Sequence, residues 1–343
     1  MPGHPPAEEF PSPPLRWFGD ADVLASMPPI EERLALAERT MVALASPGAS
    51  ELPSKIGLHP RPAGSFVHAM PAHLRAADPA DDLVGMKWVA GFGGNNARGL
   101  PAISAIVVLN DPETGLPTAI VDAGPITAQR TAAITGVALR HFGPRTSTHG
   151  TALSVALIGA GVQGHAHVPV IAAVLAGASL RLYDRHPDRV GAFADEARSI
   201  AGIGGVTTHA SASEAVESAD VVITAASFAP PTERQVMTND WLRPEATVIP
   251  VDYATFCAAE VAREAALFLV DHREQFLANR DAGNFDGYPD PTATLGEAIL
   301  AGKRRPDGRV VVTHLGVGLA DVVFADHIVR TAIAAGRGTT LRR

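Results

Sequence analysis

The stretch VALIGAGVQGHAH, residues 155–167, is the feature that most constrains the fold of this chain. Four apolar residues run into a turn with the spacing G-x-G-x-x-G, and the residues after the turn have helical character. The three glycines are Gly159, Gly161 and Gly164. At this spacing the first glycine permits a tight turn, the second lets the backbone approach a pyrophosphate, and the third lets the helix pack closely on the strand. The N–H groups of the first helical turn, which holds Val162 and Gln163, favour a phosphate. The pattern predicts a dinucleotide-binding turn.

An acidic residue about 20 positions beyond such a turn strengthens this interpretation. The segment SLRLYDRH, residues 179–186, ends its strand at Asp184, which is placed to accept both ribose hydroxyls of NAD and to repel the 2′-phosphate of NADP. Arg185 beside it can accommodate that phosphate. NAD is therefore the expected cofactor, with NADP as the alternative. The alternative is a purely structural role, in which the tight strand–helix turn binds no ligand.

Strands and helices alternate in the second half of the chain. Expected strands there are 154–158, 179–183, 220–224, 246–251 and 267–270, with helical segments between them. This rhythm predicts an α/β domain with a doubly wound parallel sheet of the Rossmann type. The first half differs. Its expected elements are a helix at 28–44, strands at 65–70, 84–90, 102–110 and 117–122, and a helix at 127–142 with Thr127 as N-cap.

The polar stretch GPRTSTHG, residues 143–150, is the best candidate for a linker between these halves. The expected organisation is a loose tail, an N-terminal α+β domain, a Rossmann domain and a C-terminal helix that rejoins the first domain. The corresponding ranges are 1–14, 15–145, 150–319 and 320–343.

Composition excludes several classes of function. The formal net charge of −8 gives no electrostatic reason to expect nucleic acid. The single cysteine, Cys257, excludes an intramolecular disulfide and a cysteine zinc cluster, and suits a reducing cytoplasm. The longest apolar stretch, near 168–180, is too short to cross a bilayer, and the first residues lack the pattern of a signal peptide. We expect a cytoplasmic protein that acts on a small molecule.

Candidate site residues follow the expected strands, because ligands of an open parallel sheet meet the carboxyl ends of its strands. The segment ADVVITAAS ends in small and hydroxyl residues that let a cofactor lie close to the backbone, among them Thr224, Ala225 and Ser227. Asp252 ends ATVIPVDY and is an acid/base candidate, although such an aspartate often caps a helix. His314, after VVVT, is a weaker candidate. His165 and His167 face differently on a helix, so no metal site is expected.

A long central run resembles the ornithine cyclodeaminase/mu-crystallin family. The run is GMKWVAGFGGNNARGLPAISAIVVLNDPETGLPTAIVDAGPITAQRTAA, residues 85–133, and it is followed by IGAGVQG and VIPVDY. The likeness extends from about residue 20 to 335. It implies an N-terminal substrate-binding and dimerisation domain, a Rossmann NAD(P) domain and a homodimer.

The resemblance also assigns roles to individual residues. Lys87 matches the family lysine that meets the substrate carboxylate, Arg130 matches its partner arginine, and Asp252 matches the catalytic aspartate of the cyclodeaminases. Lys55 stands where the family usually has an arginine, which gives up a bidentate grip on a carboxylate. The proline and threonine that cyclodeaminases tend to have near Gly93 and Ala102 are also absent.

The resemblance implies an NAD-dependent enzyme that acts at the α-carbon of an amino or imino acid. Ornithine cyclodeamination, which gives proline and ammonia, is the first specific expectation. A ketimine or imino-acid reductase and an alanine-type dehydrogenase use the same groups and stay open. A non-catalytic NAD(P)-dependent binding protein, as mu-crystallin partly is, forms a further alternative.

Overall fold

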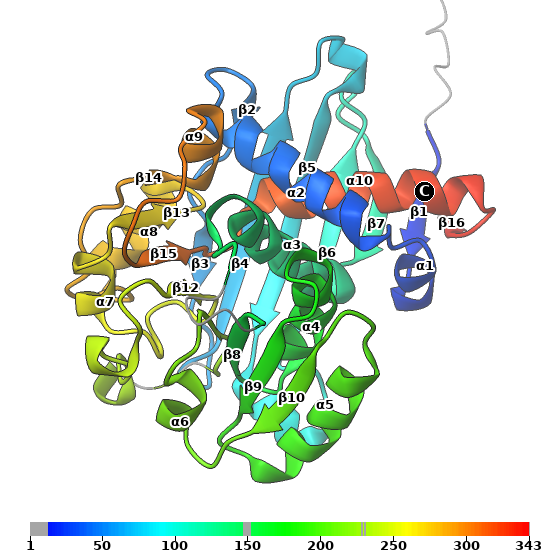
Figure 1. Cartoon of the computed structure of the whole chain (residues 1–343). Helices are drawn as coiled ribbons and strands as arrows, with labels where there is room; N and C mark the ends of the chain where they lie inside the picture. The colour runs from blue at the N-terminus through cyan, green and yellow to red at the C-terminus, as the bar shows by residue number, and fades with distance from the viewer. Residues whose placement is uncertain (1–12, 147–151, 228, 230, 343) are drawn as a thin grey trace, which may run out of the picture.

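The computed structural model describes residues 13–146, 152–227, 229 and 231–342 of the chain (Figure 1). Most of the expected tail at 1–14, and the second half of the expected linker at 143–150, lie outside the described residues. The described chain forms two β-sheets with helices packed on them.

The first sheet combines strands from the N-terminal part of the chain with the last strand. Its strands are β1 (Leu15–Phe18), β2 (Ser50–Glu51), β3 (Ile56–Leu58), β4 (Phe66–Leu74), β5 (Leu83–Gly91), β6 (Ile103–Asn110), β7 (Pro117–Asp122) and β16 (Thr339–Leu341). They lie in the order β16-β1-β7-β6-β5-β4-β2, and β3 pairs with β4. Only β1 and β7 are parallel neighbours. Burial alternates along β5, with Lys87 buried and Trp88 exposed, because successive side chains of a strand point to opposite faces.

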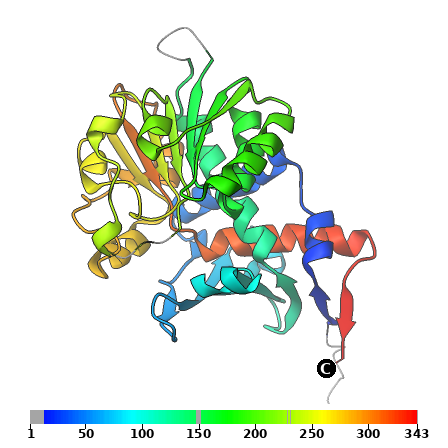
Figure 2. The ribbon, with the colours of Figure 1, turned by 90° about the horizontal axis from the view of Figure 1, so that it is seen from below.

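The α-helices that contact this sheet lie on one of its faces. They are α1 (Asp20–Ala25), α2 (Ile30–Ala45), α3 (Gly124–Phe142) and α10 (Gly318–Ala334). Figure 2 shows α10, in red, lying across the face of the first sheet. Because α10 follows the last strand of the second sheet, the chain returns to the first sheet after completing the second.

The start of α3 corrects one expectation. The helix begins at Gly124, three residues before the N-cap predicted at Thr127, and Ala123 occupies the cap position. The Thr127 hydroxyl instead donates to the carbonyl oxygen of Ala123 at 2.6 Å. Pro125 explains the earlier start, since a proline in the first helical turn loses no intrahelical hydrogen bond.

The second sheet is parallel throughout. Its strands are β8 (Ser154–Ile158), β9 (Ser179–Tyr183), β10 (Gly205–Thr208), β11 (Val221–Thr224), β12 (Thr247–Pro250), β13 (Leu267–Val270), β14 (Ala293–Thr294) and β15 (Val310–Thr313). Their order is β10-β9-β8-β11-β12-β15-β13-β14. β11, β12, β13 and β15 are buried along their whole length, as parallel strands covered on both faces must be. The predicted Rossmann-type fold is confirmed; β10 and β14 were not among the expected strands, and β15 is the VVVT segment before His314.

The remaining helices connect the strands of the second sheet. They are α4 (Val162–Val174), α5 (Pro187–Ser199), α6 (Ala212–Val216), α7 (Ala259–Arg263), α8 (Arg273–Asp281) and α9 (Leu295–Leu300). Short 3₁₀ helices occur at η1 (Pro79–Asp81), η2 (Gly93–Arg98), η3 (Pro231–Glu233) and η4 (Asn239–Trp241). None of the helices in the described ranges is both long and apolar enough to cross a membrane.

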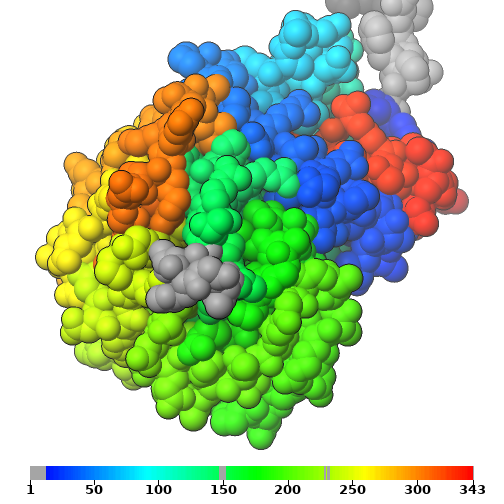
Figure 3. All heavy atoms as spheres, in the orientation of Figure 1, coloured from blue at the N-terminus to red at the C-terminus, as the bar shows by residue number. Residues whose placement is uncertain are grey.

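One face of the second sheet shares a hydrophobic core with the first sheet, and its other face packs in a second cluster. Buried residues of β8, β11, β12 and β15 belong to the same cluster as those of α2, α3, α10 and the first sheet. On the surface, α2 (blue) adjoins both α9 (orange) and α4 (green), as Figure 3 shows. This packing brings side chains of the first sheet, α3 and α10 toward the carboxyl ends of the central parallel strands, where ligands of such sheets bind.

Candidate active site

The glycine turn after β8 has the geometry that its spacing predicts. Gly159 adopts a φ of +114°, and a Cβ there would lie 2.5 Å from the carbonyl oxygen of Ala225. A Cβ on Gly164 would collide with the carbonyl oxygen of Gly159, so the third glycine allows α4 to pack on the strand. A Cβ on Gly161 would meet no protein atom within 4 Å. Open space therefore lies over the second glycine, where a pyrophosphate would approach.

The first turn of α4 faces this space with unused donors. Gly161 is the N-cap and has no side chain to satisfy the N–H groups of the first helical turn, which have no intrahelical acceptors. The turn contains Val162 and Gln163, and Val162 is 73% exposed. Such a helix start attracts a phosphate through its N–H groups and its dipole. These residues fit the pyrophosphate of a dinucleotide.

Asp184 lies directly after β9, beside the glycine turn. Its Oδ2 accepts a hydrogen bond from the backbone N–H of Ala160 at 2.8 Å, and its Oδ1 accepts one from the N–H of His186 at 2.8 Å. Each carboxylate oxygen retains capacity to accept a second hydrogen bond. Arg185 is exposed and its Nε lies 3.3 Å from Nε2 of His186. The carboxylate is thus fixed by the turn, with room to accept ribose hydroxyls.

The end of β11 is tied to Asp252, a connection that the sequence did not reveal. The Thr224 hydroxyl donates to Oδ1 of Asp252 at 3.0 Å, and the N–H of Ala226 donates to Oδ2 at 2.9 Å. The N–H of Ala225 donates to the carbonyl of Ile158 at 2.7 Å, which joins the same segment to the glycine turn. Ser227 is exposed. The buried Thr224 hydroxyl has Asp252 as its partner, and the place of Thr224 beside the cofactor stays a prediction.

Burial sets the protonation of Asp252. The residue is 4% exposed, and burial raises the pKa of its carboxyl group to about 7, although the hydrogen bonds from Ala226 and Thr224 lower it. A carboxyl group with a pKa near neutrality exists in both protonation states at physiological pH. Asp252 therefore has the property of a general acid and base.

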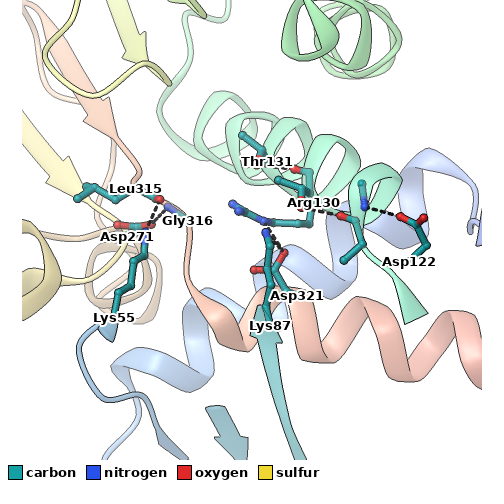
Figure 4. Close-up of polar contacts among 12 residues, drawn as sticks. Lys55, Lys87, Asp122, Arg130, Thr131, Asp271, Leu315, Gly316 and Asp321 are labelled. Atoms are coloured by element: carbon teal, nitrogen blue, oxygen red, sulfur yellow. Dashed lines mark hydrogen bonds and ion pairs between the residues drawn. The ribbon is translucent and has the colours of Figure 1, made fainter. Parts of the chain in front are cut away.

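Lys87 and Arg130 meet at a third charged residue, Asp321, as Figure 4 shows. Lys87 Nζ lies 3.0 Å and Arg130 Nε 3.1 Å from the same Oδ1 atom of Asp321. All three are buried. Burial lowers the pKa of Lys87 to about 8, against the opposing effect of Asp321. Burial alone would raise the pKa of Asp321, but Arg130 and Lys87 hold it below its usual value. Two cations and one carboxylate leave a net positive charge.

Lys55 lies apart from this cluster. Its Nζ donates to the carbonyl oxygen of Leu315 at 2.9 Å and lies 3.3 Å from the Tyr253 hydroxyl. The same loop contacts Arg130, since a Cβ on Gly316 would lie 2.5 Å from both terminal guanidinium nitrogens. Figure 4 shows Lys55 on one side of the Leu315–Gly316 segment and Arg130 directed toward it. The structure thus pairs two of the three expected anchors and connects the third through a loop.

Asp271 supports that loop from the second sheet. Its Oδ2 accepts from the N–H of Gly316 at 2.8 Å, and the side-chain amide of Gln275 donates to the Gly316 carbonyl at 3.0 Å. Gly316 has a φ of +80°, a conformation that favours glycine. Burial raises the pKa of Asp271, while the charge of Lys55 lowers it. Both polar groups of the Gly316 peptide are therefore held in place.

The histidines have structural partners. His165 contacts Glu196 at 2.8 Å, whereas His167 and His314 both contact the Thr135 hydroxyl at 2.9 Å. Burial lowers the pKa of His314 to about 3, which favours a neutral ring and does not favour the acid/base role that its position after VVVT had suggested. Across the described ranges no group of three or more His, Cys, Asp or Glu residues could hold a metal ion.

Asp321 is the main site residue that sequence reasoning missed. It lies in GLADVVFADHIV, a segment that reads as an amphipathic helix packing on the first domain. A signal was present, because an aspartate among apolar residues on a buried helix requires a cationic partner. The identity of the partners depends on β5 and α3, which are distant in the sequence.

Comparisons with known proteins show which proteins the chain resembles. A nodulation efficiency protein, NfeD, of Rhizobium meliloti is 33% identical over 332 residues, covering 95% of this chain and 98% of that protein. The ketimine reductase mu-crystallin of mouse is 29% identical over 266 residues, covering 76% and 78% of the two chains. The solved structure of Thermococcus litoralis Δ1-pyrroline-2-carboxylate reductase, in complex with NADH and L-proline, superposes with a TM-score of 0.82. It is 25% identical and covers 95% of this chain and 100% of that one. The model of the ornithine cyclodeaminase/mu-crystallin family matches residues 23–335, and the chain belongs to this family.

Proposed function

We propose that the protein is an NAD-dependent enzyme that acts at the α-carbon of an amino or imino acid. The observation that carries this proposal is Asp252, a buried carboxyl group with a pKa of about 7 at the carboxyl end of a central strand. It accepts hydrogen bonds from Thr224 and Ala226, in the segment that is itself joined to the glycine turn. An acid/base group is thereby fixed beside the proposed cofactor site.

NAD is the proposed cofactor because Asp184 directly follows β9 and a solved relative contains NADH. The space over Gly161 and the first turn of α4 would hold its pyrophosphate. Asp184 would accept the ribose hydroxyls. Bound NAD supplies an acceptor and donor for the hydrogen of the substrate α-carbon. The protein would bind NAD and the substrate in the correct relative orientation and would transfer protons.

The carboxylate of the substrate would bind at Arg130 and Lys87. Asp321 uses Nε of Arg130, so the two terminal guanidinium nitrogens, which lie against Gly316, keep N–H groups that could bind a ligand. The net positive charge of this cluster attracts an anion, and burial strengthens the interaction. Lys55 would contribute from across the Leu315–Gly316 loop. Holding the carboxylate in this way fixes the position of the adjacent α-carbon, which carries much of the reduction in barrier.

Asp252 would exchange the proton of the substrate α-amine. In its ionised form it takes a proton from the amine as the α-carbon loses its hydrogen, which leaves an imine in the site. In its protonated form it returns that proton when the imine is reduced. The hydrogen bond from Thr224 orients the carboxyl group and stabilises its charged form.

Cyclodeamination of L-ornithine is the first specific reaction that we propose. The second amine of ornithine would attack the imine, ammonia would leave, and reduction of the cyclic imine would give L-proline without net consumption of NAD. The match of Asp252 to the catalytic aspartate of cyclodeaminases supports this reaction. The second candidate is an imino-acid reductase, which the likeness to Δ1-pyrroline-2-carboxylate reductase favours.

The test is to incubate the purified protein with L-ornithine and NAD while ammonia, proline and NADH absorbance are measured together. Equal amounts of proline and ammonia without net NADH indicate a cyclodeaminase. Oxidation of NADH by cyclic or linear imino acids, without proline formation from ornithine, indicates a reductase. Cofactor and ligand binding without turnover of any amino or imino acid would instead indicate a binding protein and refute the proposal.

We further propose a cytoplasmic homodimer. The face of the first sheet opposite α10 exposes Ile56, Leu58 and Trp88, which are 65%, 57% and 41% exposed. Ile56 and Trp88 lie on one face, since each is paired with Ala69 of β4. Contiguous apolar surface of this kind marks a protein interface. The same face of a second copy, within residues 15–145, would cover it. In this proposal residues 150–319 form the NAD domain, and residues 320–343 belong to the first domain.

A further inference from the structure

Three side chains form a buried hydrogen-bonded chain that the proposed mechanism does not use. His167 lies on α4, Thr135 on α3 and His314 directly after β15. The Thr135 hydroxyl lies 2.9 Å from Nε2 of each histidine. Nδ1 of His167 lies 2.6 Å from the carbonyl oxygen of Gln163. The exposed fractions of Thr135, His167 and His314 are 0%, 0% and 2%, so bulk water does not compete for these bonds.

The direction of every proton in this chain follows from its Gln163 end, because Nδ1 of His314 at the other end has no hydrogen-bond partner among the described residues. Both rings are neutral, because burial lowers the pKa of His167 to about 4 and that of His314 to about 3. A carbonyl oxygen only accepts, so Nδ1 of His167 carries the proton and Nε2 of the same ring is an acceptor. The Thr135 hydroxyl must donate to that atom. The hydroxyl oxygen then accepts from Nε2–H of His314.

The two ends of the chain lie at the two halves of the proposed site. One end holds the Gln163 carbonyl in the first turn of α4, directly after Gly161. The other end is His314, which precedes Leu315 and Gly316. The Leu315 carbonyl accepts from the Lys55 ammonium group, and Gly316 lies against the Arg130 guanidinium group. Thr135 is on the same helix as Arg130. If a ligand displaced the first turn of α4, the hydrogen bonds would therefore move the Leu315–Gly316 loop, which lies beside Lys55 and Arg130.

We propose that Thr135, His167 and His314 are positioning residues that couple occupancy of the glycine turn to the Leu315–Gly316 loop and its cationic anchors. The hydrogen-bonded chain has one arrangement of protons and no additional donor. It can therefore pass on a change in atomic position but not a charge. The proposal rests on the proposed locations of cofactor and carboxylate. Its tests use NADH without a substrate, so failure of turnover and failure of the coupling are seen separately.

The first test compares Thr135→Val with Thr135→Ser. Valine has nearly the shape of threonine but neither donates nor accepts, whereas serine keeps the hydroxyl. Hydrogen exchange of the backbone amides at 313–318 is measured with and without saturating NADH. In the native protein and in Thr135→Ser, NADH should slow this exchange by a factor of about 5 or more, a typical allosteric coupling. In Thr135→Val, NADH should still bind but change the exchange by a factor near 1. An unchanged response in Thr135→Val would overturn the proposal.

The second test needs no substitution. Nitrogen-15 spectra of the native protein report which ring nitrogen of each histidine carries a proton. His167 should be protonated at Nδ1 and His314 at Nε2, and neither ring should be doubly protonated at pH 7. A His167 ring protonated at Nε2, or a charged ring at either position, would break the proton order and contradict the coupling. This result remains decisive if Thr135→Val does not fold.

Discussion

Lys87 and Asp321 form a fully buried ion pair, with Nζ 3.0 Å from Oδ1, although they lie 234 residues apart in the chain. β5 carries the lysine, and α10, which returns from the second sheet, carries the aspartate. Arg130 contacts the same oxygen from α3. One carboxylate therefore fixes two proposed substrate anchors and ties the C-terminal helix to the first sheet.

Asp321→Asn is expected to destabilise the protein strongly. The substitution leaves Arg130 without its buried counter-charge, and breaking a buried pair on one side typically costs about 3–5 kcal/mol. Denaturant unfolding at pH 7 measures the loss. The matched control is Asp326→Asn on the same helix, whose partner Arg330 is exposed, and which should cost about 0–1 kcal/mol. Equal losses for the two variants would show that Asp321 is not an electrostatic anchor.

The pH dependence of amino-acid oxidation should be bell-shaped. Asp252 must be ionised to accept a proton, so kcat/KM should rise as the pH increases through about 7. Lys87 must be protonated to bind a carboxylate, so kcat/KM should fall as the pH increases through about 8. Asp252→Asn should reduce kcat by about 10²–10⁴-fold and leave NADH affinity unchanged.

Thr224 provides a finer check of the same assignment. Thr224→Val removes a hydrogen bond that stabilises the ionised carboxylate of Asp252, so the acid limb should move to higher pH. Thr224→Ser keeps the hydroxyl and should keep the limb in place. An acid limb that stays fixed in Thr224→Val would mean that another group titrates.

The glycine turn allows cofactor binding to be separated from folding. Gly161 has a φ of −95° and open space around its Cβ position, so Gly161→Ala should fold normally but raise the Kd of NADH about tenfold, or ~1.4 kcal/mol. Gly164→Ala should instead lower the free energy of unfolding by about 1–3 kcal/mol, because its methyl group overlaps the Gly159 carbonyl. Calorimetry and NADH titration distinguish these results. Unchanged NADH affinity in Gly161→Ala would place the cofactor elsewhere.

The exposed face of the first sheet predicts a dimer that one charge can disrupt. Trp88→Arg should yield monomers in sedimentation experiments, because an unpaired charge in an apolar interface is costly. Leu300→Arg is the control, since Leu300 is 53% exposed at the end of α9 and away from this face. Dissociation by both variants, or by neither, would argue against this interface.

The parts of the structure that the sequence predicted depend on local patterns. β8 is a continuous apolar run followed by a glycine turn whose spacing has a steric meaning, and both are visible within thirteen residues. The position of Asp252 just after β12 can likewise be predicted from the neighbouring sequence. Thr127 was misplaced as an N-cap because the competing proline signal lay two residues upstream.

The remainder depends on contacts between distant segments. The ion-pair partner of Asp321 lies outside its own helix. Lys55 contacts the backbone carbonyl of Leu315, and a pattern of side chains in the sequence does not predict a contact to backbone. The Thr135 hydroxyl joins two histidines that are 32 and 179 residues away. The packing of α3 and α10 between the sheets creates these contacts, and periodicity alone does not specify it.

The most direct test of the central claim follows hydrogen from the α-carbon. The protein is incubated with NAD and with L-proline, L-ornithine or L-alanine deuterated at the α-carbon, and deuterium is measured by mass spectrometry in NADH and in newly formed proline. The account predicts that deuterium moves from at least one α-carbon, and that Asp252→Asn abolishes the transfer. Deuterium that stays on all three amino acids, in a protein that binds NADH normally, would contradict it.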